Sequence, residues 1–400
     1  MINPKHLRAF VAVAQTGTVV RSSRVVRRAQ SAVTRSIREL ERDLGVTLFE
    51  RRPLGMLLTE FGHALLKRVD RAFAEMNAAK QGFASVCGPS GWNDHASVFT
   101  LSMSRQRLVA YIELIENQHM GVVADHLGIS QPAVSQALRE FEVGLGVNLV
   151  TRTPTGIKPT ALGSLLAVHI RRALSEIRAA EAEVSALNGA ISGDVTVGTL
   201  SLGRTRLLPR AIIQLTESYP NLSVRTVEGS FDHLSTLLRG GDIDFILGAL
   251  RPPEHVIGLV GETITHDVLA LVVRQGHPLS RRKTLQPADL LDVAWVLPQP
   301  GAPTRDLLET ALRIRGLGAP SVTVQTADLA ITRGLLLESD MVTAVSTHLF
   351  QREIDAGDLV VLPLDLPETR RGIGILQRAT SSPSIAARLL MENLKAIGRL

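Results

Sequence analysis

The chain is poor in the residues on which small or metal-dependent proteins rely for stability. Cys87 is the only cysteine in 400 residues, which excludes an internal disulfide framework and a cysteine-rich zinc module. Aromatic residues make up only 4% of the chain, few for a protein that stacks bases or builds a β-sandwich core. No stretch approaches the roughly 18 consecutive apolar residues of a membrane helix, and residues 1–6 lack the apolar run of a secretory signal. We therefore expect a soluble, cytoplasmic protein of about two to four domains that needs no cofactor, metal or membrane.

The positive charge is concentrated in the first quarter of the chain. The formal net charge of the whole chain is +6. Residues 1–90 hold about 15 Lys and Arg against about 7 Asp and Glu, whereas residues 91–190 and 191–400 each balance to about −1. A polyanion is therefore expected to dock against the first quarter.

Residues 7–66 and 108–167 form an internal repeat with a constant offset of 101 positions and no gap. The two copies are identical at roughly 18 of 60 positions, and the clearest stretch aligns AQSAVTRSIRELE (29–41) with SQPAVSQALREFE (130–142). One repetition is too few for a solenoid. The pattern predicts a duplicated small domain.

Each copy has the periodicity of helices joined by a tight turn. Apolar residues spaced i, i+3, i+4, i+7 predict a first helix from Leu7 and from Leu108. In the second copy a short helix over 122–127, a turn over 128–130 and a helix over 131–142 follow, which is typical of a helix-turn-helix. Two short strands around a basic tip then predict the winged variant. The alternative, an ordinary amphipathic helix with a solvated face, is disfavoured because both copies keep the same polar positions.

A longer amphipathic helix follows each copy, over 60–80 and 161–187. We expect these two helices to pair within or between chains, the alternative being that each packs against its own small domain. The turn-rich segment 87–94 is expected to be a linker, in which Cys87 is incidental rather than a redox sensor.

From Gly193 the sequence alternates between strands and helices. The expected strands are 194–198, 222–227, 243–247, 269–273, 294–297, 322–325 and 341–346, and the expected helices are 207–219, 231–238, 304–315, 328–337 and 383–398. Short Gly-rich turns predict parallel βαβ units and an open sheet. Two such sheets joined by crossing segments leave a cleft, and ligands in such folds bind beyond the carboxyl ends of the strands, at helix N-termini.

These motifs together resemble LysR-type transcriptional regulators over nearly the whole chain. The run LGISQPAVS (127–135), followed by Thr160-x-x-Gly163, is close to that family's signature. In the C-terminal half, Tyr219-Pro220 and LLRGGDIDF (237–245) match its recurring pattern. The second copy is a departure, because most members carry one DNA-binding head. The chain is therefore similar to a tandem-headed subgroup, near the galactose-binding-protein regulators.

The resemblance implies a multidomain fold: two all-α, winged helix-turn-helix domains followed by an α/β, periplasmic-binding-protein-like effector domain of two Rossmann-like subdomains. The implied boundaries are 1–60 and 101–161 for the winged domains, 61–100 and 162–190 for the linker helices, and 191–400 for the effector domain. Within the effector domain, the first subdomain covers 191–268 and 371–400, and the second covers 269–370.

The function that the resemblance implies is sequence-specific binding of double-stranded promoter DNA. Recognition helices dock in the major groove, where Arg pairs with guanine and Gln with adenine, and wing arginines contact phosphate or the minor groove. The matching positions are Arg27, Arg28, Gln30, Ser31, Thr34, Arg35, Arg38, Arg51 and Arg52 in copy one, and Gln131, Pro132, Ser135, Gln136, Arg139 and Arg152 in copy two. For each residue alone, a phosphate or solvent contact is an equally good interpretation.

The two copies are not equivalent. Arg24, Arg27 and Arg28 stand where copy two has Asp125, Gly128 and Ile129. Our hypothesis is that copy one supplies more of the salt-dependent phosphate affinity, while both copies contribute comparable base recognition. Single-headed relatives typically assemble as tetramers that carry four heads. A homodimer of this chain would also carry four heads, and we expect either a homodimer or a homotetramer.

The resemblance also implies a small organic effector, an anion or a sugar, in the cleft of the C-terminal half. The implied positions are Thr199, Ser201, Ser230, Gly301 and Thr304. Hydroxyls and free N–H groups at helix starts suit a carboxylate, but these residues serve equally well as helix caps. Arg204 and Arg206 are placed either to neutralise an acid or at the surface.

An enzyme is the competing class of function. No nucleophile elbow, phosphate-binding loop, metalloprotease motif or dinucleotide fingerprint occurs, and the histidines lack the spacing of metal ligands. We therefore expect a regulator and not an enzyme. A constitutive or architectural DNA-binding regulator with a vestigial pocket is the alternative.

Overall fold

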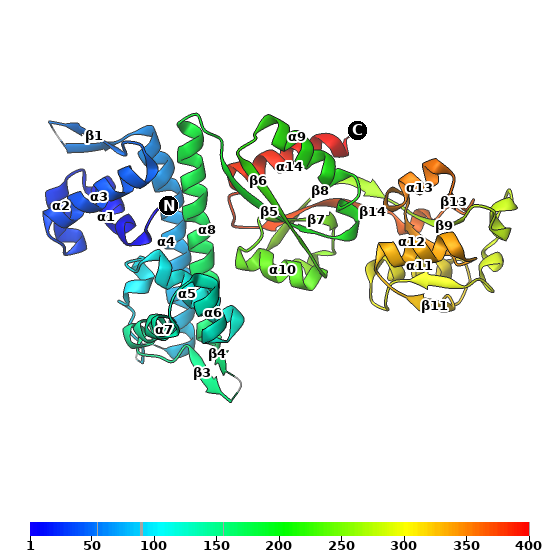
Figure 1. The fold of residues 1–400 in the computed structure, drawn as a ribbon, viewed down its shortest axis with the longest axis horizontal. Coiled ribbons are helices and arrows are strands. Elements are labelled where there is room, and N and C mark those ends of the chain that lie inside the picture. Colours follow the sequence, from blue (N-terminus) through cyan, green and yellow to red (C-terminus); the bar gives the residue numbers. More distant parts are fainter. Residues whose placement is uncertain (54, 89–90, 155, 400) are drawn as a thin grey trace.

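The computed structural model describes residues 1–53, 55–88, 91–154 and 156–399. Two small helical units lie against a pair of long helices at one end of an elongated molecule, and two α/β units follow in a row toward the other end (Figure 1). No helix in these ranges is long and apolar enough to cross a membrane.

The two small units contain the same elements in the same order. In each, three helices precede a two-stranded antiparallel hairpin. The first unit consists of α1 (Leu7–Thr16), α2 (Val19–Val26), α3 (Gln30–Leu44), β1 (Phe49–Arg52) and β2 (Gly55–Leu58). The second consists of α5 (Arg105–Asn117), α6 (Met120–Leu127), α7 (Gln131–Leu145), β3 (Val150–Thr153) and β4 (Gly156–Pro159).

The repeat seen in the sequence extends to individual hydrogen bonds. Leu48 N donates to Glu41 Oε1 at 2.9 Å, and 101 positions later Leu149 N donates to Glu142 Oε1 at 2.8 Å. The helix that follows each hairpin is capped by a threonine hydroxyl that accepts from the N–H of a glycine three residues on, at 3.1 Å in both units. Both segments therefore adopt the same winged fold that the spacing predicts.

The long helices α4 (Glu60–Cys87) and α8 (Ala161–Leu187) run antiparallel and bury one face of each against the other. Leu65, Val69 and Met76 of α4 and Ile170 and Ile177 of α8 are fully buried in a single core that also includes the small units. The expectation that the long helices pair is thus confirmed within one chain. Helix α4 is longer than expected, because its apolar stripe continues through the buried Phe83.

The linker between the copies starts later than expected. Cys87 is the last residue of α4 and not the first residue of a turn, and Gly88, with φ of 72°, ends the helix. Residues 89–90 of the expected linker lie outside the described part of the chain.

The first α/β unit is built on a five-stranded sheet with the order β6-β5-β7-β14-β8. β5 pairs in parallel with β6 and β7, but β14 is antiparallel to β7 and β8. Helices α9 and α14 pack together on one face and α10 lies on the other. The elements are β5 (Gly193–Thr199), α9 (Leu207–Ser218), β6 (Leu222–Glu228), α10 (Phe231–Gly240), β7 (Phe245–Ala249), β8 (Leu259–Asp267), β14 (Arg371–Arg378) and α14 (Ile385–Gly398).

The expected parallel βαβ units are present over β5, β6 and β7, but the sheet also contains antiparallel pairings that the sequence pattern did not indicate. Strand β14 returns from the second α/β unit and enters the sheet between β7 and β8, so it runs against both. Neither β8 nor β14 was among the expected strands, since β8 is polar and largely exposed and β14 contains two glycines.

The second α/β unit joins an antiparallel and a parallel strand group. β9 pairs with β12 and β13 in antiparallel fashion, β10 pairs with β11 in parallel, and the bridge between Trp295 and Val342 connects the two groups around the fully buried Trp295. The elements are β9 (Leu269–Arg274), β10 (Trp295–Leu297), α11 (Pro303–Ile314), β11 (Val322–Gln325), α12 (Leu329–Glu338), β12 (Thr343–Ser346), α13 (Gln351–Ala356) and β13 (Leu359–Val361).

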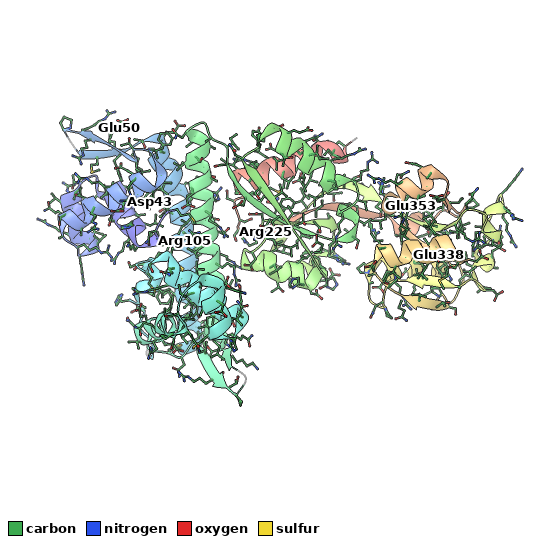
Figure 2. All side chains as sticks on the ribbon, in the orientation of Figure 1. Asp43, Glu50, Arg105, Arg225, Glu338 and Glu353 are labelled. Carbon is green, nitrogen blue, oxygen red and sulfur yellow. The ribbon has the colours of Figure 1, made fainter. Side chains whose placement is uncertain are left out.

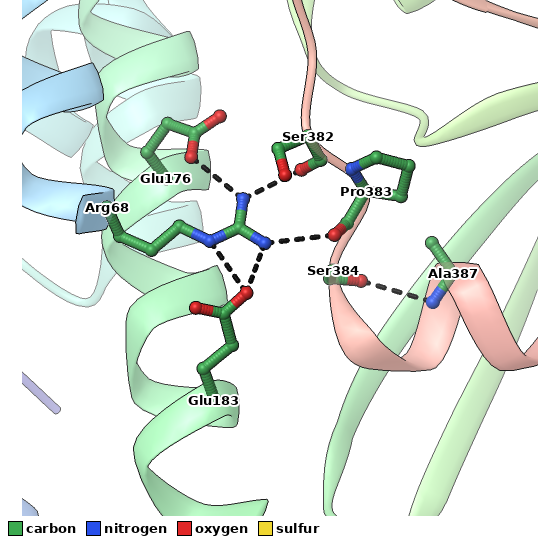
Figure 3. Close-up of polar contacts among 7 residues, drawn as sticks. All are labelled: Arg68, Glu176, Glu183, Ser382, Pro383, Ser384 and Ala387. Atoms are coloured by element: carbon green, nitrogen blue, oxygen red, sulfur yellow. Dashed lines mark hydrogen bonds and ion pairs between the residues drawn. The ribbon is translucent and has the colours of Figure 1, made fainter. Parts of the chain in front are cut away.

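The buried guanidinium of Arg68 connects the helix pair to the first α/β unit (Figure 3). Nη1 of Arg68 binds Glu176 Oε2 at 3.0 Å, and Nε binds Glu183 Oε1 at 2.9 Å, both on α8. The same group donates to the carbonyl oxygens of Ser382 and Pro383, just before α14, at 2.7 and 2.9 Å. Burial opposes its charge, but the hydrogen bonds to Glu183 and Glu176 outweigh this effect and raise the pKa of Arg68.

We predict that Arg68→Met destabilises the protein by about 3–5 kcal/mol, because it leaves two partly buried carboxylates without their counter-charge. Urea unfolding followed by circular dichroism measures the effect. The control is Arg42→Met, which removes an ion pair of a side chain that is 69% exposed and should cost at most about 1 kcal/mol. Equal losses for the two variants would contradict this account of the buried cluster.

Candidate functional site

Helices α3 and α7 each begin three residues after the left-handed residue that ends the preceding helix. Arg27 ends α2 with φ of 54°, and Gly128 ends α6 with φ of 62°. Because this conformation favours glycine, Arg27 adopts it at a conformational cost, while its side chain remains exposed. The turn is thus the same in both units although the residues differ.

The sequence-predicted DNA-contacting residues lie on the surface of the two units. Each helix buries its apolar side, Val33 and Ile37 in α3 and Val134 and Leu138 in α7, and leaves the polar side outward. Thr34 and Ser135 are half-buried. The exposed ones are Arg27, Arg28, Gln30, Ser31, Arg35, Arg38, Arg51 and Arg52 in the first unit, and Gln131, Pro132, Gln136, Arg139 and Arg152 in the second.

Few of these side chains are engaged within the protein. Arg35 lies 3.9 Å from Glu39 and is 82% exposed, and Arg52 binds Glu50 at 2.9 Å with both side chains exposed. Surface ion pairs of this kind contribute little to the stability of the protein, and their side chains rearrange readily. Both arginines are therefore available to a polyanion.

Two hollows lie side by side between α3 and α7. One, of about 640 Å³, is lined by Arg28, Ala32 and Arg35 of the first unit, and the other, of about 440 Å³, by Ile129, Ala133 and Gln136 of the second. Lys5 and Ser102 line both hollows. The sequence interpretation missed Lys5, which precedes the repeat, although its charge belongs to the basic first quarter.

The predicted effector residues lie at the carboxyl ends of three strands but have different surroundings. Thr199 is buried at the end of β5, where its hydroxyl and carbonyl bind Arg204 at 3.2 and 2.9 Å. Ser201 is exposed in the following turn. Ser230 caps α10 by accepting from His233 N at 3.2 Å, so the capping interpretation is correct for this residue.

Thr304 does not cap a helix. It lies in the first turn of α11, after the exposed Gly301 with its φ of 79°, and Ala302 is the N-cap. Its hydroxyl accepts from Arg371 Nη1 at 3.1 Å, across from the second α/β unit to the first. Arg206 lines a separate hollow of about 200 Å³ between the α/β units, together with Asp267 and His348.

Two arginines that the sequence interpretation missed lie between the α/β units. Arg371 forms a buried ion pair with Asp267 at 3.1 Å. Arg251 stands 5.0 Å from the centre of the Phe231 ring, and its buried Nε has no hydrogen-bond partner in the described part of the chain. Burial, followed by the nearby charge of Arg371, lowers the pKa of Arg251. Arg251 comes two residues after β7, so its place beyond a strand's carboxyl end was a usable signal.

This arrangement presents cationic groups beside the starts of α10 and α11. The free N–H groups of a helix start and a nearby guanidinium both favour an anion. No group of three or more His, Cys, Asp or Glu side chains suited to a metal ion occurs within the described ranges.

Comparison with known proteins identifies the family. The LysR substrate binding domain model matches residues 188–398, and the model of the bacterial regulatory helix-turn-helix protein, lysR family, matches residues 4–63 and 106–164. The chain belongs to the LysR family of transcriptional regulators. It is thus a DNA-binding regulator with an effector-binding domain, and not an enzyme.

Individual relatives of this LysR regulator differ in how much of the chain they match. The HTH-type transcriptional regulator GalR of Pseudomonas putida is 44% identical over 99% of this chain and 97% of its own length. The regulator GbpR of Azospirillum brasilense is 30% identical over 73% of this chain and 85% of its own length.

Solved structures of LysR regulators support the fold. Full-length OxyR from Pseudomonas aeruginosa has a TM-score of 0.57 at 22% identity and covers 74% of this chain and 95% of its own. CbnR has a TM-score of 0.53 at 21% identity and covers 74% of this chain and 99% of its own.

In this LysR regulator, a glycine in the first turn of each long helix packs against the backbone just before the wing hairpin. A Cβ on Gly62 or Gly163 would lie only 2.3 or 2.0 Å from the carbonyl oxygen of Leu48 or Leu149. We therefore predict that Gly163→Ala displaces the hairpin and lowers stability by about 1–3 kcal/mol, measured by urea unfolding.

The matched control is Gly144→Ala, in α7, where a Cβ would meet nothing within 4 Å. This change should raise stability by about 0.5–1 kcal/mol, since alanine favours a helix over glycine. The packing account fails if the two variants have the same effect.

Proposed function

We propose that both N-terminal units are DNA-binding heads, so that the chain is a tandem-headed LysR regulator near GalR and GbpR. The supporting observation is that the family's helix-turn-helix model matches both segments, which share fold and hydrogen bonds at an offset of 101 positions. GalR of Pseudomonas putida matches almost the whole chain, whereas GbpR covers about three quarters of it. We assign the heads to 1–60 and 101–161, the linker helices to 61–100 and 162–190, and the effector domain to 191–400.

The base-reading residues of this proposal are those exposed at the starts of α3 and α7. Gln30, Thr34 and Arg35 occupy the same places as Gln131, Ser135 and Gln136, within the first two turns of each helix. Side chains at such positions reach base edges when the helix enters the major groove. Arg51, Arg52 and Arg152, on the wing strands, are assigned to the DNA backbone or the minor groove.

The effector of this proposal is a small organic anion bound between the α/β units. The observation that carries it is Arg251, whose Nε is buried and has no hydrogen-bond partner among the described residues. A carboxylate would satisfy that N–H with a charge-assisted hydrogen bond. Ser201, Ser230, Gly301 and Thr304 contribute hydroxyls and helix-start N–H groups around it, whereas Thr199 is already bound to Arg204.

A homodimer of chains is the assembly that fits this proposal, because it presents four heads. A sugar effector is the second candidate, since hydroxyl groups such as those of Ser201 and Ser230 bind sugars as well. The charge of Arg251 favours the anion, since Arg371 is already paired with Asp267.

We predict that Arg27→Ala combined with Arg28→Ala reduces the salt slope of DNA binding by up to about 2, one for each lost phosphate contact. Fluorescence anisotropy on a promoter fragment at several salt concentrations measures the slope. The control, Arg210→Ala with Arg313→Ala, removes two exposed charges from the effector domain and should not change it. An unchanged slope in the first double variant would show that copy one does not supply the larger phosphate affinity.

We predict that a small carboxylic acid stabilises the wild-type protein and so raises its melting temperature. The gain in the free energy of unfolding is about 2.7 kcal/mol when the acid is present at 100 times its Kd. A thermal-shift screen of organic acids and sugars is the measurement. The shift should vanish in Arg251→Gln and persist in Arg210→Gln, whose side chain is exposed on α9. A response to sugars alone would contradict the anion, and silence throughout would favour a constitutive regulator with a vestigial pocket.

A further inference from the structure

Two side-chain contacts between α4 and α8 are related to each other by the repeat. Arg68 Nη1 binds Glu176 Oε2 at 3.0 Å, and His169 Nδ1 binds Glu75 Oε2 at 2.8 Å. His169 stands 101 positions after Arg68, and Glu176 stands 101 positions after Glu75. Reciprocal contacts of this kind, in which i touches j and the equivalent of j touches the equivalent of i, are the mark of a two-fold interface. Here the two-fold relation lies within one chain.

The spacing between the two heads is fixed by contacts inside the chain. Phe83 near the end of α4 packs on Trp92 and Phe99 with ring centres 5.5 and 5.6 Å apart, and Asn93 N donates to Leu145 O at 2.8 Å. Residues 92–99 are therefore packed against both the helix pair and the second head. No second chain is needed to hold one head relative to the other.

The N-terminal residues also contact α8 and the second head. Ile2 is fully buried and its N–H binds the Glu181 carboxylate of α8. Ile2 and Arg105, at the start of α5, line one hollow, and Arg105 lies where the heads meet the long helices (Figure 2). The first residues of head one are thus anchored next to head two.

The starts of α3 and α7 lie on the same side of the helix pair. Equivalent residues of the two helices, Ala32 with Ala133 and Arg35 with Gln136, line the neighbouring hollows that share Lys5 and Ser102. Two recognition helices related by a two-fold axis and held on one side are the arrangement with which helix-turn-helix dimers contact successive turns of a duplex.

We propose that a single chain reads a two-part operator with two unlike half-sites. This inference rests on the proposed DNA-binding function of both heads. The fold supplies the two-fold frame that normally needs two chains, but the reading groups at equivalent positions differ. Arg35, which suits guanine, is equivalent in the repeat to Gln136, which suits adenine. Arg28 is likewise equivalent to Ile129. The half-sites are therefore arranged as an inverted repeat but differ in base sequence.

Selection of binding sites from random duplexes by the full-length protein tests the proposal. We expect two half-sites of different sequence, separated by a whole number of helical turns of about 10–10.5 base pairs. At saturation, light scattering or native mass spectrometry should find one short duplex per chain, whether or not chains dimerise. A perfect palindrome bound by two chains per duplex would overturn the inference and leave the DNA-binding function intact. Failure to select any sequence would instead contradict the proposed function itself.

A pair of exchange variants assigns each half-site to its head. Arg35→Gln should change the base preference of one half-site only, and Gln136→Arg that of the other only, each by about 5- to 150-fold against the original base. Both side chains are exposed, so folding should be unaffected and is checked by circular dichroism. Arg42→Gln, near the end of α3, is the control and should alter neither half-site. If either exchange changed both half-sites equally, the assignment of unlike half-sites to one chain would be wrong.

Discussion

The antiparallel pairing of α4 and α8, with the charge of Arg68 buried between them, is the constraint on which the rest of the molecule depends. A guanidinium that is 1% exposed requires its carboxylate partners, and Glu176 and Glu183 supply them from the opposite helix. This requirement, together with the apolar stripe of both helices, fixes their register. The register in turn sets where the two winged units lie along the pair.

The two-fold frame is broken where the effector domain attaches. Arg68 also binds the carbonyl oxygens of Ser382 and Pro383, and Arg171 of α8 forms an ion pair with Asp242 at 2.8 Å. The equivalent edge of α4 has no second effector domain to bind. The two heads therefore differ in what they touch as well as in sequence, and these contacts form the physical connection between the effector domain and the heads.

The α/β half shows where sequence patterns lose their information. The central strands β5 and β7, and β9 to β12, were predictable because apolar residues run through them or alternate with polar ones. Strand β8 has exposed polar positions along most of its length, and β14 is interrupted by Gly372 and Gly374, so neither gives a strand pattern. At Gly374 a Cβ would lie 2.0 Å from the carbonyl oxygen of Glu262, which explains the glycine only once the two strands are seen together.

The sequence by itself determined the two winged units, the family, and the surface positions of the proposed DNA-contacting residues, because local periodicity, caps and a gapless repeat are written in neighbouring residues. The tertiary structure decided that the long helices pair within one chain, how β14 enters the sheet, and that Arg251 lies over Phe231 and Arg371 beside Thr304. These features bring together residues far apart in the chain, such as Arg68 and Ser382. Such contacts form because a buried charge needs a partner and because packed backbones must fit each other. The pattern of neighbouring residues in the sequence does not reveal which distant residue will meet either requirement.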